Sequence, residues 1–184
     1  MTSRHLLPAL AVFSLFACTA TLLTIEVRDV AETTVARGTL VEEFVGDMGF
    51  GDFVAMDVTS SSELQNQGVS DGDIRDVRLE EFRLAVVAPD GADLDFLQEV
   101  ELYVAAPDLD RVRVAVAIDF GPGVTEVQFE IDDVDLTEYV ISESMTLETE
   151  VTGNRPDEDT DLEAEYALSV GVTGQGACAF ASAN

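Results

Sequence analysis

Apolar and polar residues alternate along most of this chain. In residues 111–118, Val112, Val114, Val116 and Ile118 alternate with two arginines and two alanines. A period of two places successive side chains on opposite faces of a strand, so one face is buried and the other meets water. The same alternation runs through residues 23–27, 82–86, 100–104, 126–131, 145–151 and 162–172, and around Phe53. The pattern therefore predicts strands over most of the chain.

Strands that are buried on one face only are typical of antiparallel sheets, because parallel sheets covered by helices have continuous apolar runs. Turn-forming residues separate the predicted strands at 89–91, 107–108, 121–123 and 153–156. The pattern predicts an all-β fold, an antiparallel β-sandwich of roughly eight or nine strands, with a β-barrel as the alternative. Short helical turns are expected at residues 61–67 and at 135–140, where Asp135 would cap the turn.

The N-terminus has the pattern of a targeting segment. Arg4 and His5 precede an apolar run over residues 6–17. A membrane-spanning helix needs about 20 apolar residues, and this run has about a dozen. A secretory signal peptide over residues 1–17 is the interpretation that fits this length.

Residues 15–18, LFAC, resemble the lipobox of bacterial lipoproteins, in which a cysteine is acylated and becomes the first mature residue. The resemblance implies lipid on Cys18, contact with a membrane through that lipid, and a place at the bacterial outer membrane or cell surface. Phe16 departs from the family, which usually has a small or branched residue there. The alternative is ordinary cleavage after Ala20, which would release a secreted or periplasmic protein.

These observations divide the chain into four parts. They are a signal peptide (1–17), a short lipidated tether (18–21), a β-sandwich domain (22–173) and a loose C-terminal tail (174–184). From about Val77 onward, the sheet-rich pattern loosely resembles that of uncharacterised exported bacterial proteins.

The charge of the chain is strongly negative. It has 37 acidic residues against 9 basic ones, all of them arginine, and a formal net charge of -28. Such a surface repels nucleic acid, so a nucleic-acid-binding role is excluded. Adaptation to a saline exterior explains the acidity most simply, because salt screens the self-repulsion.

Several kinds of catalysis lack the residues that they need. His5 is the only histidine and lies in the predicted signal peptide, and lysine is absent. The mature chain therefore has no histidine-based triad and no lysine nucleophile. We expect no cofactor and a non-catalytic envelope lipoprotein that serves as a structural or protein-interaction module. A secreted or surface ligand-binding or adhesive sandwich with structural calcium is the second hypothesis, and a carboxylate hydrolase is the third.

One acidic stretch suggests the calcium site of the second hypothesis. Asp157, Asp159 and Asp161 alternate in the sequence NRPDEDTDLE. Calcium takes about six to eight oxygen ligands, and alternate acids in a loop can supply several of them. The stretch is not an EF-hand, because leucines occupy the sixth and twelfth positions. A calcium ion held between sandwich loops, with help from Asp71 and Asp73, is one interpretation, and a solvated acidic turn is the other.

Overall fold

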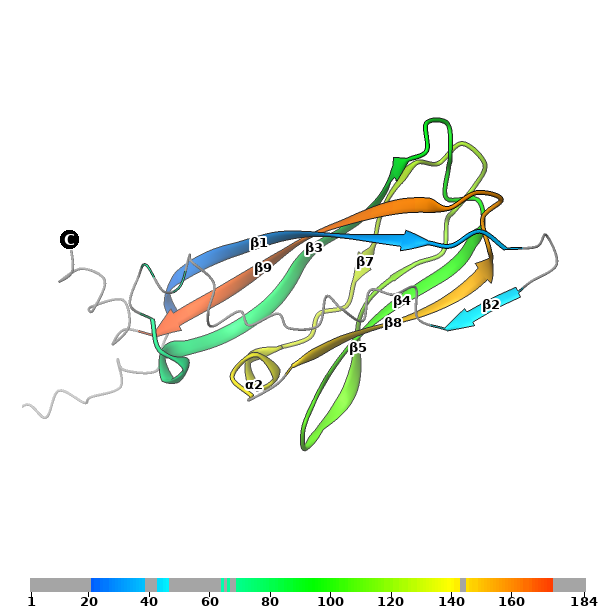
Figure 1. Ribbon diagram of the computed structural model, residues 1–184. Coiled ribbons are helices and arrows are strands. Elements are labelled where there is room, and N and C mark those ends of the chain that lie inside the picture. The colour runs from blue at the N-terminus through cyan, green and yellow to red at the C-terminus, as the bar shows by residue number, and fades with distance from the viewer. Residues whose placement is uncertain are drawn as a thin grey trace, which may run out of the picture.

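The computed structural model describes residues 21–38, 64, 66, 69–142 and 145–173, and the backbone of residues 43–46. Strands dominate these ranges (Figure 1). The strands are β1 (Thr21–Val35), β2 (Glu43–Gly46), β3 (Ile74–Ala88), β4 (Leu97–Ala106), β5 (Leu109–Ala117), β6 (Glu126–Gln128), β7 (Glu130–Ile131), β8 (Thr146–Asn154) and β9 (Thr160–Thr173). The helical segments are a 3₁₀ turn, η3 (Asp71–Asp73), and one α-helical turn, α2 (Thr137–Val140).

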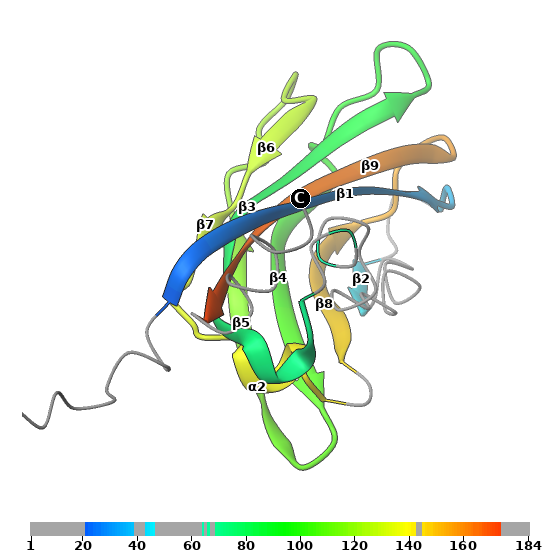
Figure 2. The same ribbon diagram turned by 90° about the vertical axis from the view of Figure 1, so that its left-hand side faces the viewer.

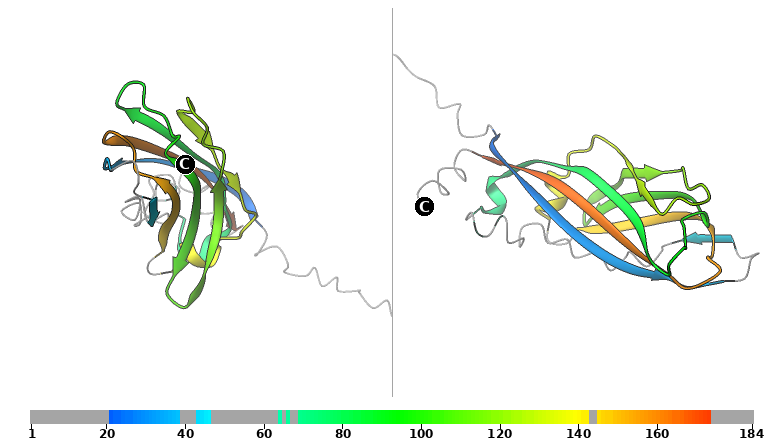
Figure 3. Two further views of the ribbon diagram at one scale, coloured as in Figure 1. Left: turned by 90° about the vertical axis from the view of Figure 1, so that its right-hand side faces the viewer. Right: turned by 90° about the horizontal axis from the view of Figure 1, so that it is seen from above.

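The strands form two antiparallel sheets. One sheet has the order β1-β9-β3-β6 and the other has the order β2-β8-β4-β5-β7. Figures 2 and 3 show the first sheet lying across the second as two layers. The predicted all-β sandwich is confirmed, with nine strands among the described residues. The described strands form two separate sheets and not one closed sheet, so the architecture is the sandwich and not the alternative barrel.

The core lies between the layers and follows the alternation of the sequence. Strand β9 lies between β1 and β3, and its buried side chains include Leu162, Ala164, Tyr166, Leu168 and Val170. Strand β4 contributes a matching apolar face from the other sheet. Each fully buried leucine or valine contributes about 1.5–3 kcal/mol to folding. The polar residues that alternate with them face outward and form ion pairs on the surface of each sheet.

One predicted strand divides between the two sheets. Residues 126–131 read as a single strand, but β6 pairs with β3 and β7 pairs with β5. Phe129 lies between them, buried, with its N–H bonded to the Phe82 carbonyl at 3.0 Å. Its ring meets the Phe82 ring edge to face, with centroids 4.9 Å apart. Local alternation cannot reveal this crossing, because both halves keep the same period.

The described residues include the predicted helical turn at 135–140 and the first predicted strand, but not several other predicted segments. The helical turn at 135–140 is present as α2, and Asp135 accepts bonds from the Thr137 N–H at 2.9 Å and its hydroxyl at 2.6 Å. Strand β1 extends far beyond the predicted 23–27 and begins at Thr21. The signal peptide, Cys18, the strand around Phe53, most of 61–67 and the tail 174–184 lie outside the described residues. Within those that are described, no helix has the length and apolar character needed to cross a membrane.

Candidate functional site

A hollow of about 550 Å³ lies at one end of the sandwich, where the β3–β4 and β8–β9 loops meet. It is the best candidate site in the part of the chain that the structure describes. The lining residues are Pro89, Asp90, Gly91, Ala92, Asp93, Asp95, Phe96, Asn154, Arg155, Pro156, Asp157, Glu158 and Thr160. Five of these carry a carboxylate and one carries a guanidinium, so the hollow is acidic.

The β3–β4 side of the hollow is fixed by a single carboxylate. Asp93 accepts hydrogen bonds from the Gly123 N–H at 2.7 Å and from the Asp95 N–H at 3.2 Å. These two donors hold the pKa of Asp93 below its usual value. The fully buried Leu94 anchors the same loop, and its N–H donates to the Val124 carbonyl at 2.8 Å. Asp93 is therefore committed to holding the loop and remains charged.

The β8–β9 side is fixed by a close backbone approach. The Asn154 N–H donates to the Phe96 carbonyl at 2.7 Å. A Cβ on Gly153 would lie 2.4 Å from that same carbonyl oxygen, so only glycine fits there. Arg155 donates to the Ala36 carbonyl at 3.3 Å, which ties this loop to the chain that follows β1. The β8–β9 wall of the hollow is therefore held by a backbone hydrogen bond to Phe96 and by the Arg155 side chain.

Carboxylates from both loops lie close together in the hollow. The pKa of Asp95 is raised, first because neighbouring atoms displace water from its carboxylate and then because Asp93 and Asp157 lie close to it. A positively charged group placed here would relieve this repulsion. The hollow is therefore chemically suited to cationic groups.

The structure separates the three aspartates that the sequence suggested as calcium ligands. Asp157 lines the hollow. Asp159 accepts from the Arg37 N–H at 2.9 Å, and Asp161 accepts from the Thr34 hydroxyl at 2.6 Å. The last two therefore fasten the end of β1 to the start of β9. In the ranges that the structure describes, no group of three or more His, Cys, Asp or Glu side chains is arranged to hold a metal ion.

Asp71 and Asp73, the suggested further ligands, lie at the other end of the molecule. Asp73 accepts from the hydroxyl of Thr173, the last residue of β9, at 3.3 Å. The hollow includes Thr160, the first residue of β9. A 14-residue strand spans about 43 Å from end to end. Asp71 and Asp73 therefore cannot share an ion with Asp157.

Sequence reasoning missed Asp93 and Asp95, which line the hollow together with Asp157. They lie in the stretch PDGADLDF, directly after the turn signal at Pro89. Acids that follow a turn signal at the end of a strand are the signal that could have found them. Their proximity to Asp157 comes from the pairing of β4 with β8, which the sequence pattern does not specify.

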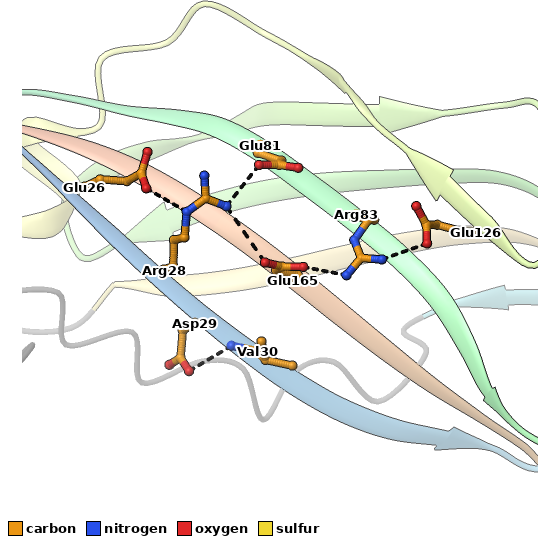
Figure 4. Close-up of polar contacts among 8 residues, drawn as sticks. All are labelled: Glu26, Arg28, Asp29, Val30, Glu81, Arg83, Glu126 and Glu165. Atoms are coloured by element: carbon orange, nitrogen blue, oxygen red, sulfur yellow. Dashed lines mark hydrogen bonds and ion pairs between the residues drawn. The ribbon is translucent and has the colours of Figure 1, made fainter.

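The outward face of the first sheet carries a continuous network of ion pairs (Figure 4). Arg28 on β1 contacts Glu26 at 2.7 Å, Glu81 on β3 at 3.1 Å and Glu165 on β9 at 3.8 Å. Glu165 also contacts Arg83 on β3 at 2.5 Å, and Arg83 contacts a glutamate of β6 at 2.7 Å. The network therefore crosses all four strands. The bond from Arg28 lowers the pKa of Glu26.

The second sheet has a similar outward face. Arg111 contacts Glu148 and Glu150 of β8 at 2.7 and 2.8 Å, and its guanidinium lies 3.5 Å above the Tyr103 ring. A separate arginine on β5, Arg113, bridges β4 and the chain after β7 through two carboxylates. Burial lowers the pKa of Arg111, but Glu148 and Glu150 outweigh this effect and raise it. The two carboxylates beside Arg113 likewise raise its pKa. Pairs of this kind are screened in water and contribute little individually, so we interpret both faces as solvated surfaces.

Comparison with known proteins adds no functional assignment. The chain matches no family model and no curated protein sequence.

Proposed function

We propose that the chain is a non-catalytic lipoprotein of the bacterial cell envelope, a protein-interaction module that lipid on Cys18 holds at a membrane. The observation that carries the proposal is the position of the hollow relative to the start of β1. Thr21 pairs with Thr173 at one end of β9, and Val35 pairs with Thr160 at the other. The acidic hollow is at the Thr160 end.

This arrangement gives the module an orientation. Three peptide units join Cys18 to Thr21, and they span at most about 11 Å. An acylated Cys18 would therefore hold the Thr21 end of the sandwich close to the bilayer. The hollow, about 43 Å further along β9, would face away from the membrane.

Charge supports a covalent anchor. With a net charge of -28, the chain is repelled by anionic headgroups and cannot be held at a membrane by electrostatics. Buried acyl chains contribute about 0.8 kcal/mol per methylene, independently of the charge of the protein. The five acidic residues that line the hollow favour a partner with a cationic segment.

Membrane attachment can be tested with the two cysteines of the chain. In a bacterial host, Cys18→Ser should move the protein from the membrane fraction to the soluble fraction. The matched control is Cys178→Ser, which changes the same residue type outside the predicted lipobox and should leave the protein in the membrane fraction. A wild-type protein that is already soluble, or equal release of both variants, would contradict the proposal.

The hollow can be tested separately with a tetralysine peptide as the probe. The double variant Asp95→Asn/Asp157→Asn should weaken peptide binding at fixed ionic strength, measured by fluorescence anisotropy. The control Asp71→Asn/Asp108→Asn removes the same charge outside the hollow. Equal weakening by the two double variants would show that net charge alone binds the peptide, and would leave the hollow without a special role.

A further inference from the structure

Among the strands that the structure describes, one edge strand is long. Strands β1 and β6 bound one sheet, and β2 and β7 bound the other. Three of these four are short, with three residues in β6, four in β2 and two in β7, whereas β1 has 15. A long edge strand can pair with a further strand through the backbone groups that point away from its neighbour. The position where such recruitment would occur is therefore β1.

The far side of β3 is covered although β6 is short. The Leu136 N–H donates to the Val77 carbonyl at 2.8 Å, and the Val77 N–H donates to the Thr137 hydroxyl at 3.1 Å. The Phe129 N–H donates to the Phe82 carbonyl further along β3. The chain between β6 and α2 thus occupies this side. For β1, by contrast, β9 is the only neighbouring strand within the described ranges.

Asp29 interrupts the apolar face of β1 near its middle. Ile25 and Val27 face the core and are buried, and the alternation places Asp29 next on the same face. Instead of contributing an apolar group, its Oδ1 accepts from the Val30 N–H at 2.8 Å. Figure 4 shows the Asp29 carboxylate on the side of β1 away from β9. Its Oδ2 also accepts a long hydrogen bond from the hydroxyl of Tyr166 at 3.5 Å.

Apart from Asp29, the sequence of β1 is well suited to antiparallel pairing with a second copy of the same strand. In an antiparallel pair centred on Val30, Val30 would lie opposite its own copy, and Arg28 would lie opposite Glu32 twice. Val30 is 49% exposed, so the pairing would also bury apolar surface. The central step of that ladder needs the Val30 N–H, which the Asp29 carboxylate occupies. Displacing that carboxylate would leave a charge at the new interface without its donor.

We propose that Asp29 guards the edge of β1 and keeps the sandwich from pairing with a second copy of itself through this strand. The guard acts through the hydrogen bond to the Val30 N–H and not through negative charge alone. An asparagine at position 29 keeps the acceptor oxygen and should preserve the guard, whereas an alanine should remove it.

The test is the oligomeric state of the full chain, measured by sedimentation in a Cys18→Ser background so that no lipid contributes to association. Asp29→Ala should shift the monomer–dimer equilibrium toward dimer by about tenfold or more. Two variants serve as controls. Glu32→Ala removes the same charge from the same strand, and Tyr166→Phe removes the hydroxyl contact but leaves the Val30 bond. Both should sediment as the parent chain does.

The remaining outcomes each decide the proposal. If Asp29→Ala stays monomeric, or if Glu32→Ala associates equally, the guard is refuted. If Asp29→Ala does not fold, the proposal is tested instead by the sedimentation of Asp29→Asn and by the rate of hydrogen exchange at the Val30 amide. The guard requires Asp29→Asn to remain monomeric and the Val30 amide to exchange more slowly than its edge neighbours. Rapid exchange of that amide in the parent chain would overturn the proposal.

Discussion

Replacing Phe129 tests the point where the chain passes from one sheet to the other. Phe129 is 4% exposed, and its ring packs edge to face on Phe82 at 4.9 Å. Phe129→Ala removes a buried aromatic ring from between β6 and β7 and should cost about 3–5 kcal/mol. For a domain of this size, each kcal/mol lowers Tm by about 2–4 °C, so the expected decrease is about 6–20 °C.

A double-mutant cycle isolates the contact between the two rings. Phe82→Leu and Phe129→Leu both keep an apolar side chain, and the coupling between them should be about 0.5–1.5 kcal/mol. Urea unfolding at fixed salt, followed by circular dichroism, measures each free energy.

The control is Ile118→Ala, which truncates a side chain that is 70% exposed just beyond β5. It should change stability by no more than about 0.5 kcal/mol. If Phe129→Ala cost no more than this control, or if the coupling were zero, the packing of the sheet crossing as described here would be refuted.

Three further predictions follow from single features of the structure. Gly153→Ala should lower the free energy of unfolding in urea by about 1–3 kcal/mol, because the added Cβ would meet the Phe96 carbonyl. The control Gly72→Ala places its Cβ in open space and should leave that free energy almost unchanged. Equal effects of the two variants would contradict the close approach at Gly153. Burial and the nearby Asp29 carboxylate raise the pKa of Tyr166, so its contribution to stability is complete below the ordinary tyrosine value of about 10 and is lost as pH rises above it. Tyr166→Phe should therefore lose less stability than the parent chain between neutral pH and about pH 11, and an identical pH profile would refute this. Sodium chloride should raise Tm by screening the net charge, and calcium chloride at equal ionic strength should raise it equally, because the three aspartates suggested as ligands do not converge; an additional rise with calcium would contradict that geometry.

The sequence predicts the strands best where one face is buried throughout. The alternation in residues 162–172 describes β9 well, because β9 lies between two strands and its inner face is covered along its length. It fails at Phe129, where a period of two continues while the partner strand changes. Pairing partners depend on contacts between residues distant in the chain, and a local pattern carries no information on them.

The candidate site was only partly predictable for the same reason. The sequence places Asp157 in an acidic stretch, and the structure shows that it lines the hollow. Its neighbours Asp159 and Asp161 looked equivalent in sequence, but each bonds to the β1 side of the sheet instead. Alternate residues at the start of a strand point to one face of the sheet, and only the structure shows that residues at and just after the end of β1, the strand that pairs with β9, bond to two of them.

The most direct test of the proposed function is the mass of the mature N-terminal peptide from protein made in a bacterial host. The proposal predicts a chain that begins at Cys18 and carries acyl groups on that residue. An unmodified chain that begins at Thr21 would contradict it and would indicate a freely secreted domain.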